Sequence, residues 1–301
     1  MTLFYSDVFV LPLPSHHRFP MGKYLRLRER LLASGDFVDN DFRVPDGASD
    51  AEITRAHCPQ YLRRVATGAL DAAEIRAIGF PWSERMVERS RRSSGATLAA
   101  AREALTRGWS ANLAGGTHHA FRDRGEGFCV FNDAAIAARA LQSEAGLQRV
   151  AVVDCDVHQG NGTAAIFAGD DSVFTFSIHG ARNFPFAKEA SDLDIELADG
   201  TGDDEYLWHL ERGLDETLER SRPQLAFYLA GADPYEDDRL GRLKLTKAGL
   251  ARRDALVLGT LAARGIPVAI AMAGGYARDI EDSVEIHANT LHTAREIFRD
   301  S

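Results

Sequence analysis

The stretch VAVVDCDVHQGNG, residues 150–162, contains the strongest fold signal in this 301-residue chain. It opens with four small or β-branched apolar residues and passes at Asp154 into a polar segment. A short apolar run with polar and glycine residues after it is typical of a strand buried on both faces, as in a parallel sheet covered by helices. We therefore predict a central strand over residues 150–153.

Short apolar, β-branched runs also occur at residues 172–177, 225–229 and 268–272, and a further predicted strand segment, residues 110–113, runs into Gly115-Gly116. The spacing of apolar residues predicts helices between and around them, over residues 24–33, 83–107, 132–145, 203–220, 246–264 and 279–298. Strands that alternate with helices form right-handed βαβ units and a parallel sheet between two helical layers. Because no repeat or linker interrupts the pattern, we expect one three-layer α/β domain over residues 1–301, with a mostly parallel central sheet.

Polar or glycine-rich clusters directly follow four of the predicted strands. The first cluster contains Asp154, Asp156 and His158. The other three are Gly115-Gly116-Thr117-His118-His119, Gly231-Ala232-Asp233 and Gly274-Gly275-Tyr276. Since the carboxyl ends of parallel strands meet at one edge of a sheet, where ligands bind, we expect these clusters to converge on one site.

Asp156 and His158 have a spacing that suits two ligands of one metal ion. Side chains alternate between faces in extended backbone, so Asp154, Asp156 and His158 would project to the same side. A catalytic zinc ion takes three protein ligands and a water, and Asp233 at a second strand end is the natural third ligand. The alternative is that Asp156 caps a helix beginning near Gly162 and that His158 is a loop residue. The spacing alone leaves both interpretations open.

The pair His118-His119 and the isolated Tyr276 are candidate proton-transfer groups. Imidazoles change charge near neutral pH, and the glycines before the pair permit a tight turn at a strand end. Adjacent histidines are also common on solvated loops. The hydroxyl of Tyr276 could donate a hydrogen bond to a developing oxyanion, although a Gly-Gly-Tyr segment is also typical of a turn followed by a packed aromatic ring.

The composition argues against several classes of protein. Cys58, Cys129 and Cys155 form no CxxC pair, which disfavours a disulfide framework and a thiolate zinc site. The net charge is -9 and the basic residues are dispersed, so no nucleic-acid partner is indicated. No signal peptide is recognisable, and no apolar run reaches the roughly 20 residues of a membrane helix. We expect a soluble, cytoplasmic protein without a membrane partner, and the sequence does not indicate its oligomeric state.

Together these clusters resemble the histone deacetylase family within the wider arginase-deacetylase fold. The motifs stand in family order along nearly the whole chain, at residues 115–120 (GGTHHA), 127–133 (GFCVFND), 154–162 (DCDVHQGNG), 231–233 (GAD) and 273–276 (AGGY). The segments most similar to the class IV branch and its bacterial relatives are residues 79–83 (GFPWS), 158–162 (HQGNG) and 238–241 (DRLG). The resemblance implies a hydrolase that acts on linear amides.

The resemblance implies one metal ion. It matches the zinc ligands of the family to Asp156, His158 and Asp233, with ferrous iron as the alternative metal in the cell. Zinc would polarise the acyl carbonyl and lower the pKa of its water. Arginase-type sites hold two manganese ions and use further carboxylates, but this chain has Gly160 and Tyr235 at those places. Hydrolysis of guanidines is therefore not expected.

The resemblance also assigns catalytic roles. His119 matches the general base that accepts the water proton, and His118, backed by Asp154, matches its electrostatic partner. Tyr276 matches the hydroxyl that donates to the oxyanion. One residue departs from the commoner pattern, because Asn161 stands where many relatives have an aspartate paired with the general base. An amide adds no negative charge, so we expect His119 to be less basic than its counterparts.

Further matches concern the substrate tunnel and potassium. The resemblance implies a narrow apolar tunnel for a lysine side chain, lined by Gly127, Phe128, Phe186, Leu240, Gly274 and Gly275. It implies an inner potassium site at Asp154, Asp156, His158, Ser177 and Ile178. It implies an outer potassium site at Phe167, Asp170, Val173 and Tyr206.

The expected substrate is an acylated lysine, from which the enzyme would remove an acetyl or another acyl group. Two alternatives remain. One is a deacetylase of small acylated amines such as acetylpolyamines. The other is a non-catalytic module that binds acyl-lysine or a partner protein, which the complete set of candidate ligands, histidines and tyrosine disfavours.

Overall fold

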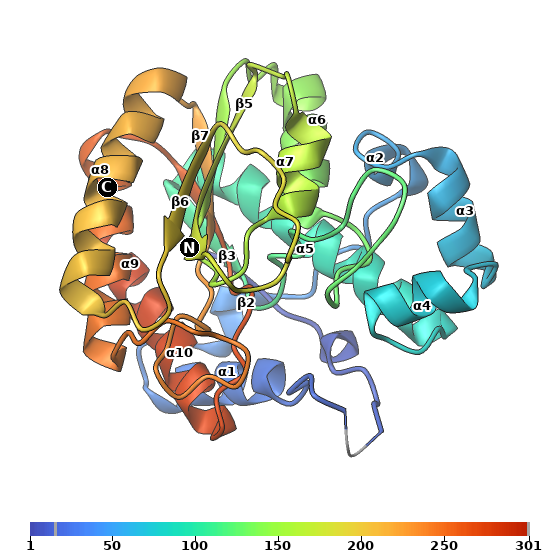
Figure 1. The fold of residues 1–301 in the computed structure, drawn as a ribbon, viewed down its shortest axis with the longest axis horizontal. Coiled ribbons are helices and arrows are strands. Elements are labelled where there is room, and N and C mark those ends of the chain that lie inside the picture. The colour runs from blue at the N-terminus through green and yellow to red at the C-terminus, as the bar shows by residue number, and fades with distance from the viewer. Residues whose placement is uncertain (15–16, 300–301) are drawn as a thin grey trace.

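The computed structural model describes residues 1–14 and 17–299, and one eight-stranded sheet forms its centre (Figure 1). The strand order is β2-β1-β3-β8-β7-β4-β5-β6, and every neighbouring pair is parallel, which confirms the predicted parallel sheet. The strands are β1 (Leu3–Phe4), β2 (Phe42–Arg43), β3 (Trp109–Asn112), β4 (Val150–Asp154), β5 (Val173–Gly180), β6 (Leu193–Leu197), β7 (Leu225–Leu229) and β8 (Val268–Ala271).

Helices cover both faces of the sheet, as Figure 1 shows, with α5, α6 and α7 on one face and α8, α9, α10 and α1 on the other. The six predicted helices are all present, and each end lies within one residue of its predicted position. They are α1 (Lys23–Ala33), α5 (Glu84–Arg107), α6 (Asp133–Ala145), α8 (Asp203–Ser221), α9 (Lys247–Ala263) and α10 (Ile280–Ile297).

Shorter elements were not predicted from apolar periodicity. They are α2 (Asp50–Ile53), α3 (Pro59–Thr67), α4 (Ala72–Ile78), α7 (Asn161–Phe167), two 3₁₀ segments (Asp7–Phe9 and Asp39–Asp41) and strands β1, β2 and β6. A helix of one or two turns has too few residues for a repeating apolar stripe. Two of the short helices do carry another signal, because Ser49 with Glu52 and Asp71 with Glu74 form capping boxes at the starts of α2 and α4.

The chain changes direction across the sheet between β4 and β7. From β4 it adds β5 and β6 on one side, and it then returns to place β7 and β8 on the other side of β4. Every residue of β4 and β7 is buried, as expected for central strands with helices on both faces. In open parallel sheets, such a point of reversal leaves a crevice at the carboxyl ends of the two strands. The segments that follow β4 and β7 are therefore placed to form a site.

Within the described residues, none of the helices has both the length and the apolar character needed to cross a membrane.

Two helical glycines have opposite surroundings, which gives a test of the packing. A Cβ atom at Gly95, in the middle of α5, would lie 1.9 Å from the Asp46 carbonyl oxygen, whereas a Cβ at Gly259 in α9 has no neighbour within 4 Å. Alanine in place of a helical glycine normally stabilises a protein by about 0.5–1 kcal/mol. We expect Gly259→Ala to raise the free energy of unfolding by this amount, and Gly95→Ala to lower it by about 1–3 kcal/mol through overpacking. Urea denaturation measures both, and equal effects would contradict the close approach of α5 to the 46–48 segment.

Candidate active site

Asp156, His158 and Asp233 come together at the crevice between β4 and β7. Asp156 and His158 follow β4, and Asp233 follows β7. One ligand atom from each lies within 4.8 Å of the other two, and all three residues are buried. The Nδ1 atom of His158 lies 2.9 Å from Asp156 Oδ1 and 3.2 Å from Asp233 Oδ2. The predicted ligand trio therefore forms one cluster, and His158 is not a solvated loop residue.

The local backbone brings Asp156 and His158 together in a way that differs from the prediction. Strand β4 ends at Asp154, and the next residues form a bend, so the expected alternation of an extended strand is wrong here. The Asp156 amide donates to Asp154 Oδ1 at 3.1 Å, and the His158 amide donates to Asp156 Oδ1 at 2.9 Å. Each aspartate carboxylate thus accepts a hydrogen bond from the amide two residues further along the chain, as aspartates do in turns.

Amide groups from other loops hold the two carboxylates. The amide of Val157 donates to Asp233 Oδ1 at 2.9 Å, and the amide of Gly274 donates to Asp156 Oδ2 at 2.7 Å. Residue 274 must be glycine, because a Cβ atom there would lie 1.9 Å from Asp233 Oδ2. Hydrogen bonds to the two carboxylates therefore connect the segments that follow β4, β7 and β8.

The donor set fits a divalent transition metal ion. Asp233 Oδ2 is buried and makes no hydrogen bond with any described residue. Burial, together with the Asp156 charge, raises the pKa of Asp233 to about 7, because a second negative charge away from water is unfavourable here. Two carboxylates and one imidazole leave coordination positions open for water and substrate, as in catalytic zinc sites. Among the described residues, no other cluster of histidine, cysteine, aspartate or glutamate has metal-ligating spacing.

The two adjacent histidines lie beside this cluster and have different partners. His118 Nδ1 lies 2.6 Å from Asp154 Oδ2, while His119 Nδ1 lies 2.7 Å from Asn161 Oδ1. The two rings are 4.1 Å apart between centroids. Burial opposes the charged imidazolium of His118, but the carboxylates of Asp154 and Asp156 outweigh it and raise its pKa to about 9.

His119 is the less basic of the two. Burial and the neighbouring His118 and His158 rings lower the pKa of His119 well below its usual range. The Asn161 side-chain nitrogen donates to Glu126 Oε1 at 2.6 Å, so the Asn161 oxygen faces the ring and accepts the hydrogen on Nδ1. This arrangement leaves Nε2 of His119 as the nitrogen with the free lone pair.

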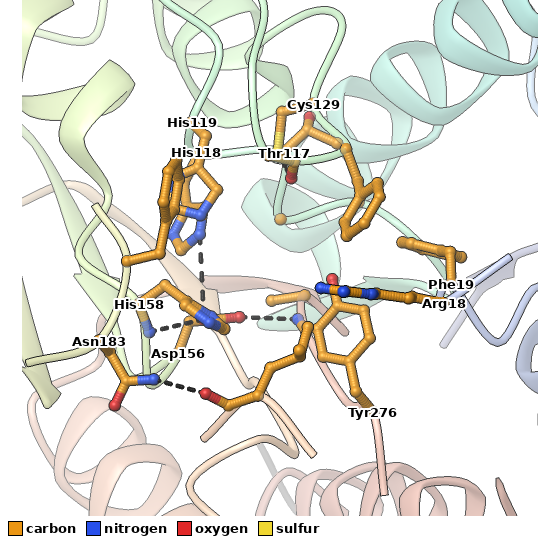
Figure 2. A pocket seen from close by; sticks show the side chains of 18 of the residues that line it. Arg18, Phe19, Thr117, His118, His119, Cys129, Asp156, His158, Asn183 and Tyr276 are labelled. Atoms are coloured by element: carbon orange, nitrogen blue, oxygen red, sulfur yellow. Dashed lines mark hydrogen bonds and ion pairs between the residues drawn. The ribbon is translucent and has the colours of Figure 1, made fainter. Parts of the chain in front are cut away.

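A cavity of about 400 Å³ opens over these groups. Figure 2 shows His118, His119, His158 and Tyr276 around this common space. The ring of Tyr276 packs against Phe19, Phe128 and His158, with centroid distances of 5.8, 6.1 and 6.4 Å. Five of the six predicted tunnel residues line the cavity: Gly127, Phe128, Phe186, Leu240 and Gly274. Gly275 does not.

Phe186 does not form the inner wall that the sequence analysis predicted. It is 86% exposed, and the ring that packs against His119, at 4.9 Å, belongs to Phe184. Phe184 also lines the cavity. The segment Phe184-Pro185-Phe186 contains two aromatic residues of the same type, and spacing alone cannot decide which of them turns inward.

Of the residues matched to the inner potassium site, Asp154 and Ser177 are partners across β4 and β5. The predicted outer site is not assembled as expected. Phe167, Asp170 and Val173 share one turn between α7 and β5. Tyr206 lies in α8 on the opposite face of the sheet (Figure 1). It is buried there beside Cys155, and burial raises its pKa well above the usual range.

A buried ion pair behind the site was not predicted. Arg253 Nη1 in α9 donates to the Gly231 carbonyl at 2.5 Å, and its Nη2 lies 2.8 Å from Asp254 Oδ1. Asp254 also accepts the hydroxyls of Tyr228, at 2.5 Å, and Thr290, at 2.6 Å. The sequence contained a signal for this pair, because Arg253 and Asp254 fall among the apolar residues of the predicted helix 246–264 that face the sheet.

The parallel sheet, its point of reversal and the convergence of polar residues there define an α/β protein of the arginase-deacetylase class. The family model of the histone deacetylase domain matches residues 17–291. The chain is 44% identical to an uncharacterized protein of Picosynechococcus sp. over 294 residues, or 98% of both chains. It is 30% identical to histone deacetylase 2 of Arabidopsis thaliana over 292 residues, or 93% of this chain and 76% of that protein. The chain therefore belongs to the histone deacetylase family.

The fold is also similar to a solved structure, that of acetylpolyamine aminohydrolase from Burkholderia pseudomallei. The TM-score is 0.79 with 24% sequence identity, over 99% of both chains. The predicted family, its bacterial relatives and the fold are thus confirmed.

Removal of one ligand tests the metal site. We expect the wild-type chain to bind one Zn²⁺ ion and Asp233→Asn to bind it more than about 100-fold more weakly, since loss of a mere orienting partner already costs about 10–100-fold. Competition with a chromophoric chelator measures the affinity. Asp237→Asn is the matched control, because Asp237 is an exposed carboxylate paired with Arg278 at 3.0 Å. Equal affinities for the two variants would contradict the assignment.

Adjacent arginines of α9 test the buried ion pair. Arg253 is fully buried, whereas Arg252 is exposed and pairs with Asp204 at 3.0 Å. We expect Arg253→Met to lower the free energy of unfolding by about 3–5 kcal/mol, because Asp254 is left charged and buried. Arg252→Met should change it by less than about 0.5–1 kcal/mol. Denaturant unfolding measures both, and a small effect at Arg253 would show that the ion pair is not essential to the fold.

Proposed function

We propose that this protein is a zinc-dependent hydrolase that removes an acyl group from the side-chain amide of acyl-lysine. The observation that carries this proposal is the combination of a buried Asp156, His158 and Asp233 cluster with an imidazole pair in one cavity. Fold membership alone does not establish activity, so the proposal depends on these groups and their distances.

The metal would be held by Asp156, His158 and Asp233, and when bound it would polarise the acyl carbonyl and lower the pKa of the attacking water. Zinc is the proposed ion, with ferrous iron as the alternative in the cell. We further propose that potassium, held at the ends of β4 and β5 near Ser177, has a structural role. The positions of Asp154 and Ser177 in adjacent strands support this site.

His119 supplies the general base in this proposal. His119 lines the cavity and Asn161 holds its Nδ1, so Nε2 would take the water proton and return it to the leaving amine. His118 keeps its positive charge, because Asp154 stabilises the imidazolium, and it stabilises negative charge that develops beside it. The pKa values of the two histidines thus differ in the direction that an acid-base pair requires.

Tyr276 is the proposed oxyanion donor. Its backbone is held on both sides, because its amide donates to Asp238 Oδ2 at 2.6 Å and Arg239 Nε donates to its carbonyl at 3.1 Å. Burial raises its pKa well above the usual range, so the hydroxyl keeps its proton and remains a hydrogen-bond donor.

The passage to these groups supports an acylated amine with an apolar stem. Phe128 and Phe184 line it, and aromatic walls suit the methylene chain of a lysine while excluding water. A second candidate substrate is a small acylated amine, because the similar solved structure is an acetylpolyamine aminohydrolase. A non-catalytic acyl-lysine-binding module would have no use for a general base and an oxyanion donor next to a metal site.

Replacement of the tyrosine tests the function. With zinc bound, we expect the wild type to hydrolyse acetyl-lysine peptides and Tyr276→Phe to lose about 100–1,000-fold in kcat with its metal content unchanged, as loss of one oxyanion donor does. Tyr235→Phe is the control, since Tyr235 does not line the cavity. Liquid chromatography of the peptides and metal analysis of the variants are the measurements.

Full activity of Tyr276→Phe would remove the oxyanion role. If the zinc-loaded wild type hydrolyses no acyl-amide at all, the proposed hydrolase function is wrong and the binding-module alternative gains support.

A further inference from the structure

The charged residues that line the cavity have one dominant sign. Asp156 supplies the carboxylate, and it belongs to the metal cluster. Four arginines also line the cavity, and one of them, Arg89, is buried at its inner end, where Nε donates to the Phe9 carbonyl at 3.0 Å. The other three, Arg18, Arg182 and Arg242, are exposed, and we call them the rim arginines.

The rim arginines come from three separate segments. Arg18 precedes α1, Arg182 follows β5, and Arg242 lies between β7 and α9. Figure 2 shows the Arg18 side chain extending toward the space above the Tyr276 ring. Three cations from distant parts of the chain thus meet at one opening of a protein whose net charge is -9.

Two of the three segments are joined directly. The Asn183 side-chain nitrogen donates to the Leu240 carbonyl at 2.8 Å, and its oxygen accepts the Arg242 amide at 3.2 Å. Asn183 itself is buried. Arg182 and Arg242 are therefore kept on the same side of the opening by a buried cross-link, and their proximity does not depend on the flexible side chains alone.

The rim arginines are only partly neutralised by the chain itself. Asp199 lies 3.1 Å from Arg242 and 4.0 Å from Arg182, so one carboxylate is shared between two guanidinium groups. No carboxylate of residues 1–14 or 17–299 lies within ion-pair distance of Arg18. The ammonium of nearby Lys188 donates to the Asn183 and Pro185 carbonyls, at 2.7 and 2.5 Å, so the loop that carries Arg182 already holds it. In the described part of the structure, the three rim guanidinium groups thus have one paired carboxylate among them, Asp199.

From this arrangement we infer that the enzyme selects acyl-lysine in an acidic sequence context and discriminates against cationic acylated amines. The inference rests on the proposed function and specifies its substrate class. An acyl-lysine that reaches the metal cluster through the passage leaves its flanking residues at the rim, where carboxylates would pair with the arginines. An acetylated diamine or polyamine would instead bring its free ammonium against like charges. Phe186, 86% exposed beside the arginines, offers apolar contact to the same flanking residues.

The expected size of the effect follows from the exposure of the arginines. Exposed ion pairs contribute about 0.2–1 kcal/mol each, which corresponds to about 1.5–5-fold in kcat/KM for each arginine engaged. Charges at a rim act mainly on association and are screened by salt. The preference should therefore appear in KM and in kcat/KM and should weaken as the ionic strength rises.

The test compares acetyl-lysine peptides of one sequence that carry Glu, Gln or Lys on both sides of the acetyl-lysine, together with N-acetylputrescine. We expect kcat/KM to fall in the order Glu, Gln, Lys, with about 10-fold between the Glu and Lys peptides at low salt and much less near 1 M salt, where the Debye length is about 3 Å. N-acetylputrescine should be a poorer substrate than the Gln peptide, because its one ammonium meets the rim arginines.

Variants test whether the peptide preference depends on the rim arginines or on the overall charge of the protein. In Arg18→Gln/Arg182→Gln/Arg242→Gln, the ratio between the Glu and Lys peptides should approach one. The matched control is Arg252→Gln, because Arg252 is an exposed arginine of α9 that does not line the cavity, and this variant should keep the wild-type ratio. Asp199→Asn should increase the ratio, since it frees Arg182 and Arg242 from their shared carboxylate.

Failure of the selectivity inference and failure of the proposed function give different results in this test. If the Gln peptide is hydrolysed but the Glu and Lys peptides do not differ, or N-acetylputrescine is the best substrate, the selectivity inference is overturned while the proposed function stands. If no peptide is hydrolysed, the proposed function fails. Fluorescence anisotropy of the three labelled peptides on the zinc-loaded protein then decides the charge preference separately, and equal affinities would overturn it.

Discussion

Two carboxylates, Asp156 and Asp233, are buried side by side at the ends of neighbouring strands, and the rest of the site depends on compensating their charge. Carboxylates removed from water require hydrogen bonds and cations in their place. Amides from the adjoining loops supply the hydrogen bonds, a glycine at position 274 permits their approach, and the geometry of the remaining lone pairs suits a divalent metal ion. The amide donors can reach the carboxylates because three loops meet where the strand order reverses.

The same principle extends outward from the metal cluster. On the far face of the sheet, Arg253 and Asp254 form a buried ion pair that holds the Gly231 carbonyl, two residues before Asp233. Inside the cavity, a carboxylate stabilises one histidine as a cation, while an amide leaves the other neutral. His118 and His119 thus differ in charge because one faces a carboxylate and the other an amide, although the two histidines are adjacent in sequence.

Long-range features of the fold were predictable because they depend on repeating patterns. The six long helices follow apolar stripes of many residues, and the central strands follow apolar runs bounded by polar residues. A two-residue strand such as β1 is too short for such a pattern, whereas α3 carries a local signal instead, with Pro59 at its start and Gly68 after its end. The edge strand β6 alternates acidic with apolar residues, unlike the buried strands used as the guide.

The sequence by itself determined that Asp156, His158, Asp233, the histidine pair and Tyr276 would meet, because parallel strands must end at one edge and these residues directly follow strand ends. Only the tertiary structure decided how they meet. A bend, not an extended strand, turns His158 toward Asp156; Phe184, not Phe186, faces His119; and the sheet separates Tyr206 from Phe167. These outcomes depend on side-chain direction and on the face of the sheet that each helix covers, and both are set by contacts between segments distant in sequence.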